Sequence, residues 1–195
     1  LQHRVVIPGC GGIGSTVAET LARLGVGVFR LSDPDRFEVG NFNRQLGATL
    51  ATVGQYKAEA VAERILSINP EADIEVITEP VSEVNADSFV DGATVVLDGI
   101  DFFALTARRA LFSAAQRQGI PAMTAAPLGF SASLQVYLPY HGMSFDEFFN
   151  LKKNDSSAEQ LLKFFVGLAP KALQRQYMDM SKVDVTRQSG PSSIL

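Results

Sequence analysis

A glycine-rich turn directly after an apolar run is the feature that most constrains this fold. Residues 5–7 form a short β-branched run that ends at Pro8, and Gly9, Gly11, Gly12 and Gly14 follow it, with helical periodicity starting at Ser15. Glycine permits a tight turn with close approach of backbone N–H groups to a phosphate, whose charge the helix N-terminus favours. Asp33 lies nineteen residues after Gly14, where an acid can accept a ribose hydroxyl. The pattern predicts a nucleotide site at the first crossover of a Rossmann-like sheet.

Strand and helix patterns alternate through about residue 125, which predicts parallel strands joined by right-handed crossovers. We therefore expect an α/β fold, a Rossmann-like three-layer sandwich with a mostly parallel sheet. The capping-box pattern from Thr52 to Gln55 predicts a helix that starts there, with Lys57 in its first turn. The expected strands cover 5–7, 26–32, 74–78, 94–97, 122–124 and 133–138, and the expected helices cover 15–24, 52–69, 104–118, 158–168 and 171–180.

The composition narrows the functional classes. The 195 residues carry a net charge of −4 with a pI near 5.2, so the overall positive field of a typical nucleic-acid-binding protein is lacking. The single cysteine, Cys10, allows no internal disulfide and no zinc cluster, which suits a reducing cytoplasm. No apolar run approaches the roughly 20 residues needed to span a bilayer. The sequence begins at Leu1 without an initiating Met, so we expect a piece of a longer cytoplasmic chain.

The glycine turn and Asp33 alone would serve an NAD(P)-dependent oxidoreductase equally well. Three downstream groups favour a triphosphate instead. They are Asn41 to Gln45, which includes Arg44, then Gly54 to Lys57, and Asp98 to Asp101. Transfer of an adenylyl group requires cations and a metal-binding acid near the α-phosphate, because charge must be neutralised as pyrophosphate leaves.

These motifs, taken in order, resemble one superfamily. Gly-x-Gly-Gly-x-Gly, Asp-x-Asp after the second strand, Asn-x-x-Arg-Gln, Gly-x-x-Lys-Ala-Glu and Asp-x-x-Asp look like ThiF/MoeB/HesA-type adenylyltransferases and ubiquitin-activating enzymes over residues 5–138. The Asn-x-Asn-Arg-Gln and Lys-Ala-Glu forms are also similar to the tRNA threonylcarbamoyladenosine dehydratase branch. The resemblance implies that residues 1–139 form the ATP-binding core and 140–195 a largely helical segment of the same domain.

The resemblance also implies roles for single residues. Arg44, Lys57 and Asp101 would be catalytic, with Asp101 as the magnesium ligand and Asn41 holding the phosphate chain together with the two cations. The expected nucleotide-binding set is Gly9, Gly11, Gly12, Gly14, Asp33, Asp35, Asn41, Arg44, Gln45, Lys57 and Asp98. Plainer interpretations stay open: Arg44 and Lys57 as solvated charges, and Asp98 and Asp101 as caps of a helix that begins at Phe102.

The function that the resemblance implies is ATP-dependent adenylation of a carboxylate, with Mg²⁺, on a small ubiquitin-like or sulfur-carrier protein. A homodimer is also implied. Alternatives are cyclisation of threonylcarbamoyladenosine in tRNA, an oxidoreductase, and a non-catalytic scaffold. Phe102 stands where the family often has Asn, and the thioester cysteine and the Cys-x-x-Cys pairs of some members are missing. Cys10 lies inside the glycine turn, where packing is a better expectation than nucleophilic chemistry.

Overall fold

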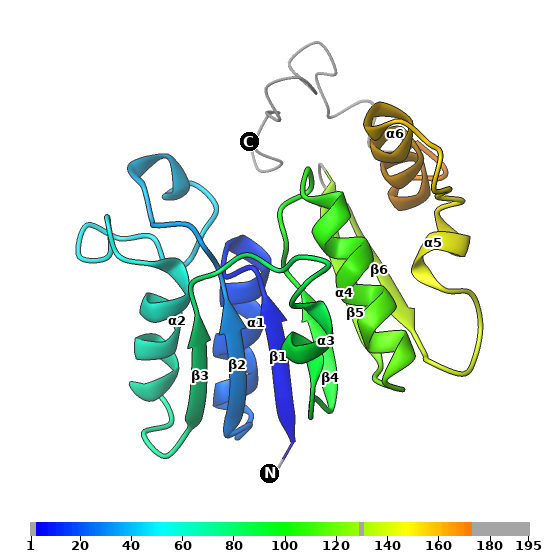
Figure 1. The fold of residues 1–195 in the computed structure, drawn as a ribbon. Helices are drawn as coiled ribbons and strands as arrows, with labels where there is room; N and C mark the ends of the chain where they lie inside the picture. The colour runs from blue at the N-terminus through cyan, green and yellow to red at the C-terminus, as the bar shows by residue number, and fades with distance from the viewer. Residues whose placement is uncertain (1–2, 129–130, 173–195) are drawn as a thin grey trace.

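The computed structural model describes residues 3–128 and 131–172 of the chain, and six strands and six α-helices lie within these ranges (Figure 1). The strands are β1 Arg4–Pro8, β2 Val28–Ser32, β3 Asp73–Ile77, β4 Val95–Asp98, β5 Ala122–Leu128 and β6 Ser131–Tyr137. The helices are α1 Gly12–Arg23, α2 Lys57–Leu66, α3 Ala86–Val90, α4 Leu105–Arg117, α5 Phe145–Phe148 and α6 Ser157–Leu168, with a short 3-10 turn, η1, at Val39–Asn41.

The strands form one sheet in the order β3-β2-β1-β4-β5-β6. All neighbouring pairs are parallel except β5 and β6, which run antiparallel. The chain leaves β1 toward β2 on one side and returns to β4 on the other, so the order reverses at β1. In open α/β sheets, ligands bind in the crevice at the carboxyl ends of the strands at such a reversal.

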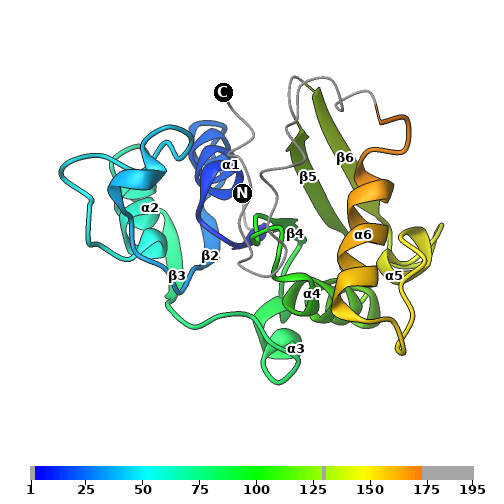
Figure 2. The ribbon, with the colours of Figure 1, turned by 90° about the horizontal axis from the view of Figure 1, so that it is seen from above.

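Helices cover both faces of the sheet, which confirms the three-layer prediction (Figure 2). Alternate side chains of β1 point to opposite faces: Val5 and Ile7 pack with α1 and α2, whereas Val6 packs with α3 and α4. On β2, Phe29 packs in the same apolar cluster as Val5 and Ile7. Arg30 lies on the other face and donates to the carbonyl oxygens of Phe89 and Asp91.

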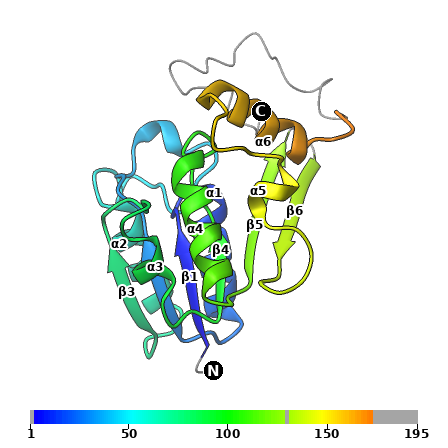
Figure 3. The same ribbon diagram turned by 45° about the vertical axis from the view of Figure 1, so that its right-hand side comes forward.

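Helices α5 and α6 pack into the same apolar cluster as α4. The Phe145 ring centroid lies 4.6 Å from that of Phe112 and 5.9 Å from that of Phe164, and the Phe149 centroid lies 4.8 Å from that of Phe164. Arg109 of α4 pairs with Asp146 at 2.6 Å and also donates to Gln160 of α6. Figure 3 shows α6 lying near the ends of β5 and β6, so this helix helps to enclose that end of the sheet.

Most expected elements are present, but the start of the second helix was predicted wrongly. Helix α2 begins at Lys57, five residues after Thr52, and Tyr56 is its N-cap. The Thr52 hydroxyl instead donates to the Gly47 carbonyl and accepts from the Thr49 N–H, so it closes a turn in the loop. The sequence did not predict η1, α3 or α5 as helices. The helix expected over 171–180 lies almost entirely outside the described residues.

Within the described part of the chain, no helix is both long and apolar enough to cross a membrane.

Candidate active site

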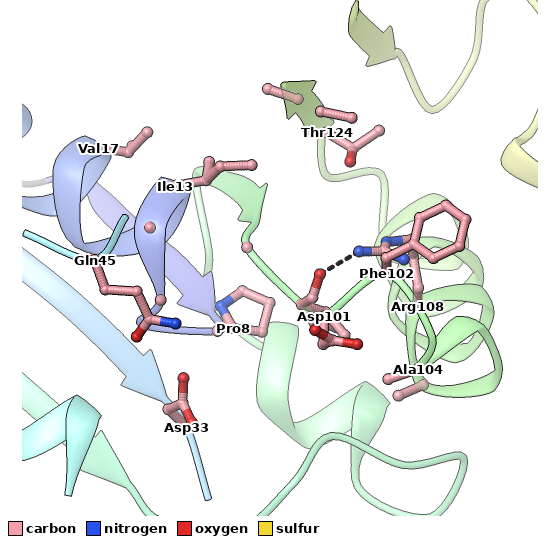
Figure 4. Close-up of a pocket in the computed structure, with 18 of the residues that line it drawn as sticks. Pro8, Ile13, Val17, Asp33, Gln45, Asp101, Phe102, Ala104, Arg108 and Thr124 are labelled. Carbon is pink, nitrogen blue, oxygen red and sulfur yellow. Dashed lines mark hydrogen bonds between the residues drawn. The ribbon is translucent and has the colours of Figure 1, made fainter. Parts of the chain in front are cut away.

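A cavity lies at the carboxyl ends of β1, β2 and β4, where the strand order reverses. Its volume is about 760 Å³, which is within the range of small-molecule sites. The glycine turn, Asp33, Asp35, Arg44, Gln45, Lys57 and Asp101 line it, so the predicted residues come together from five separate segments of the chain. Figure 4 places Asp33 and Gln45 on one side and Phe102 and Arg108 on the other, with Pro8 and Asp101 between them.

The glycine turn requires glycine because other backbone lies against it. A Cβ on Gly9, whose φ is +86°, would fall 2.1 Å from the Gly99 carbonyl oxygen, and one on Gly14 would fall 1.8 Å from the Gly9 carbonyl oxygen. The Gly99 N–H donates to the Pro8 carbonyl oxygen at 2.8 Å. The turns after β1 and β4 are therefore packed backbone to backbone, and Gly11 and Gly12 are left on the cavity surface.

Asp33 holds the glycine turn in place. One of its carboxylate oxygens accepts from the Cys10 N–H at 2.7 Å, and the other accepts from the Asp35 N–H at 2.9 Å. Burial raises the pKa of Asp33, and these two hydrogen bonds and the nearby Lys57 charge partly oppose the shift. The same carboxylate lines the cavity, so its remaining lone pairs are available to a ligand hydroxyl.

Cys10 is part of the glycine turn, and its side chain is fully buried. Burial, followed by the Asp33 charge, raises the pKa of its thiol far above the usual range. The side chain thus stays protonated and packs with Ile7 and Ala18, in agreement with a structural role rather than a nucleophilic one.

Lys57 is a buried cation that lines the cavity. Its ammonium pairs with Asp35 at 2.8 Å, and its backbone N–H donates to the Asp35 carbonyl oxygen, so the first residue of α2 is fixed at both ends. Arg44 is exposed, and its guanidinium donates to the Gly40 carbonyl oxygen and the Asn43 amide oxygen. The Gln45 side chain lies beside Gly11, and its Oε1 is buried without a hydrogen-bond partner among the described residues.

One acid, Asp98, ends β4 and another, Asp101, follows it, and the two differ in their surroundings. Asp98 has a side chain with no exposed surface, and it accepts from Arg108 Nε at 2.6 Å and from the Ile100 N–H at 3.0 Å. Asp101 is exposed at the cavity, and its Oδ1 accepts from the Phe103 N–H at 2.9 Å. Helix α4 starts at Leu105 rather than at Phe102, so Asp101 closes the turn that precedes the helix.

Three of the predicted nucleotide-binding residues are outside the cavity lining, namely Gly14, Asn41 and Asp98. Gly14 provides space for the Gly9 carbonyl, and the Asn41 side chain accepts from the Glu38 N–H to cap η1. Asp98 reaches the cavity only through its partner, Arg108.

Sequence reasoning missed a second group that lines the cavity. It comprises Phe102 and Arg108, the small residues of β5 that follow Thr124, and Phe164 and Leu168 from α6. Arg108 did carry a signal, because it lies three residues after Leu105 and four before Phe112, on the apolar stripe of a helix. No local pattern brings α6 to this cavity, because that contact depends on how the chain packs after β6.

The comparisons with known proteins bear on this site. The model of the ThiF family matches residues 1–183, which is nearly the whole chain. The chain belongs to the ThiF family.

The curated relatives of this chain include proteins of different kinds. The tRNA threonylcarbamoyladenosine dehydratase of Escherichia coli is 39% identical over 126 residues, which is 64% of this chain and 46% of that protein. The sulfur carrier protein ThiS adenylyltransferase of Escherichia coli is 30% identical over 139 residues, which is 71% of this chain and 55% of that protein. The chain therefore spans about half the length of the curated relatives it matches.

Solved structures share the fold. The E. coli tRNA N6-threonylcarbamoyladenosine dehydratase in complex with ATP has a TM-score of 0.60 and 33% identity, and the match covers 67% of this chain and 59% of that one. The structure of PaaA has a TM-score of 0.67 and 28% identity, covering 98% of this chain and 59% of that one. The match to PaaA thus extends over the part of this chain that includes α6, which supplies Phe164 and Leu168 to the cavity.

Proposed function

We propose that the chain catalyses ATP-dependent adenylation of a carboxylate, with release of pyrophosphate. The observation that carries this proposal is one cavity in which a glycine turn, the cations Arg44 and Lys57 and the exposed acid Asp101 meet at the carboxyl ends of the strands. Family membership and a similar protein solved with ATP support the choice of nucleotide. The reaction joins a carboxylate oxygen to the α-phosphorus of ATP. The bond from that phosphorus to the oxygen that bridges the α- and β-phosphates breaks, and pyrophosphate leaves with that oxygen.

The residues of the chain fit ATP on structural grounds. The glycine turn exposes Gly11 and Gly12 at the start of α1, where backbone N–H groups and the helix dipole favour phosphate. Arg44 and Lys57 provide positive charge against the triphosphate, and Asp33 offers acceptor positions to the ribose. The unpartnered amide oxygen of Gln45 gives the same side of the cavity a further polar group for a nucleotide.

Magnesium fits this site only in combination with phosphates. Within the described ranges no group of three or more His, Cys, Asp or Glu side chains forms a metal cage. Mg²⁺ commonly binds through one or two carboxylates together with substrate phosphates, so Asp101 alone is a sufficient protein ligand. Such an ion would neutralise charge on the departing pyrophosphate. The chain's own contribution is to position the reactants and to provide fixed charges.

For the acceptor we propose a peptide or protein carboxylate, such as the C-terminus of a ubiquitin-like or sulfur-carrier protein. The net charge of −4 argues against the phosphate neutralisation that dominates tRNA binding. The apolar wall of Phe102, Phe164 and Leu168 fits a polypeptide better than a phosphate backbone. The 39% identity to a tRNA-modifying relative makes threonylcarbamoyladenosine in tRNA the second candidate.

The test is acceptor-dependent release of pyrophosphate from ATP. The protein is incubated with Mg-ATP and either a sulfur-carrier protein that ends in Gly-Gly or bulk tRNA that contains threonylcarbamoyladenosine. We expect the carrier protein to stimulate release and tRNA to leave it at the background rate. Stimulation by tRNA alone, with formation of the cyclic nucleoside, would replace the acceptor and retain adenylation. No release with either acceptor, together with no ATP binding, would contradict the proposed chemistry.

A further inference from the structure

We propose that Arg108 and the apolar wall around it form the subsite that binds the acceptor carboxylate. The inference rests on the proposed function and assigns a binding role to a residue outside the predicted set. It starts from a buried cation whose hydrogen bonds are incomplete.

The Arg108 side chain is only 5% exposed, yet it lines the cavity. Its Nε donates to Asp98, and its Nη2 donates to the Ile100 carbonyl oxygen. Its Nη1 is buried and has no hydrogen-bond partner among the described residues. A buried donor without a partner costs free energy, and guanidinium N–H groups are suited to carboxylates. An anion in the cavity would accept the hydrogen bond for which Nη1 has no partner.

Two contacts fix the direction of the guanidinium. The Asp98 side chain is completely buried, and its carboxylate accepts a hydrogen bond from Arg108 Nε. The Phe164 ring lies against the guanidinium, with its centroid 4.9 Å from Cζ. Because Asp98 and the Ile100 carbonyl occupy Nε and Nη2, Nη1 is the nitrogen whose hydrogen-bonding capacity remains for a ligand.

The position of Arg108 favours the acceptor over the nucleotide. The glycine turn, Lys57, Arg44 and Gln45 already line the side where phosphates are expected. Arg108 lies with Phe102 on the opposite side, and Asp101 lies between Arg108 and Pro8 (Figure 4). A carboxylate held at Arg108 would thus approach the nucleotide across Asp101, as attack on the α-phosphorus requires.

The surroundings also indicate the chemistry of the group that bears the carboxylate. Phe102, Phe164 and Leu168 line the cavity near Arg108, and the rings of Phe102 and Phe164 are 5.4 Å apart. An apolar wall lowers the local dielectric constant, which strengthens the pairing of a carboxylate with the guanidinium. The ligand class is therefore a carboxylate flanked by apolar groups, and 3-phenylpropanoate is the smallest convenient probe.

The test is a binding titration by nuclear magnetic resonance, with 3-phenylpropanoate and its amide as probes and ADP present. We expect the wild-type chain to bind the carboxylate in the millimolar range and the amide at least about 10-fold more weakly, because the amide lacks the charge-assisted hydrogen bond. Two variants remove Arg108: Arg108→Met, and Asp98→Asn with Arg108→Met, in which no unpaired charge remains. Each folded variant should lose carboxylate binding by about 10-fold or more and retain ADP binding within about 2-fold.

Arg117→Met provides the matched control. Arg117 lies on the same helix, is exposed and pairs with Asp87, so its loss should leave probe binding unchanged. Equal binding of the carboxylate to wild type and to the double variant would overturn the proposal, as would no binding to wild type. Loss of ADP binding with Arg108 would assign the residue to phosphates. If ADP binds normally and only the probe result fails, the proposed adenylation itself is untouched.

Discussion

Replacing Asp101 by Ala is expected to lower the rate of acceptor-dependent pyrophosphate release by about 10²-fold or more, the typical loss when one electrostatic contact made in the transition state is removed. Asp101 lines the cavity and is exposed, so the folded structure should tolerate the change apart from the turn that it closes at Phe103. Lys57→Ala is expected to cause a loss of similar size, because Lys57 is the buried cation on the phosphate side.

The measurement is pyrophosphate release at saturating ATP, with circular dichroism as a check on folding. Asp87→Ala is the matched control, since Asp87 is an exposed acid that pairs with Arg117 away from the cavity lining. A folded Asp101→Ala variant with the wild-type rate would remove Asp101 from the active site. A slow Asp87→Ala variant would mean that the losses are not specific to the site.

The second large effect concerns stability. Arg108→Met is expected to lower the free energy of unfolding by about 3–5 kcal/mol, because it leaves the Asp98 carboxylate buried without its ion-pair partner. Asp98→Asn combined with Arg108→Met should recover most of this loss, since the buried charge is then gone and the amide oxygen can still accept from Ile100. Chemical denaturation of the three proteins provides the comparison.

Arg117→Met sets the baseline for a surface ion pair, where we expect a change within about 1 kcal/mol. If Arg108→Met were no more destabilising than Arg117→Met, the buried pair would not be what holds the end of β4 to α4. If the double variant were as unstable as Arg108→Met, the loss would come from missing packing against Phe164 rather than from the Asp98 charge.

The central layers of the fold could be predicted from local patterns. A β-branched run before a glycine turn, as at Val5 to Gly14, specifies both the strand and the start of the helix, because the turn has few other solutions. The start of α2 could not be predicted in the same way. Thr52 has the side chain of an N-cap, but its hydroxyl is used within the loop, and a local pattern does not distinguish these two partners.

The site likewise has one part that local patterns predict and another part that they do not. The nucleotide side comes from short motifs that fold locally at strand ends, so Asp33, Arg44 and Lys57 could be placed near the glycine turn from the sequence. The other side is made by contacts distant in sequence: Arg108 with Asp98, and Phe164 from α6 against both Arg108 and Phe102. Nothing local to residues 157–168 indicates that this helix reaches the cavity, because its apolar stripe would suit any covered surface.

Other expectations stay predictions. The homodimer, the cytoplasmic location and the magnesium ion at Asp101 come from the family resemblance and the composition. The division of the chain at residue 139 is also untested, although α5 and α6 share one apolar cluster with α4.

The central claim is that this cavity binds ATP for adenylation rather than a dinucleotide for hydride transfer. The most direct test is a calorimetric titration of the protein with Mg-ATP and, separately, with NAD. We expect saturable binding of Mg-ATP that weakens by at least about 10-fold in Lys57→Ala, because charge-assisted contacts to phosphate are lost, and no detectable binding of NAD. Tight binding of NAD without binding of ATP would contradict the account and would favour an oxidoreductase.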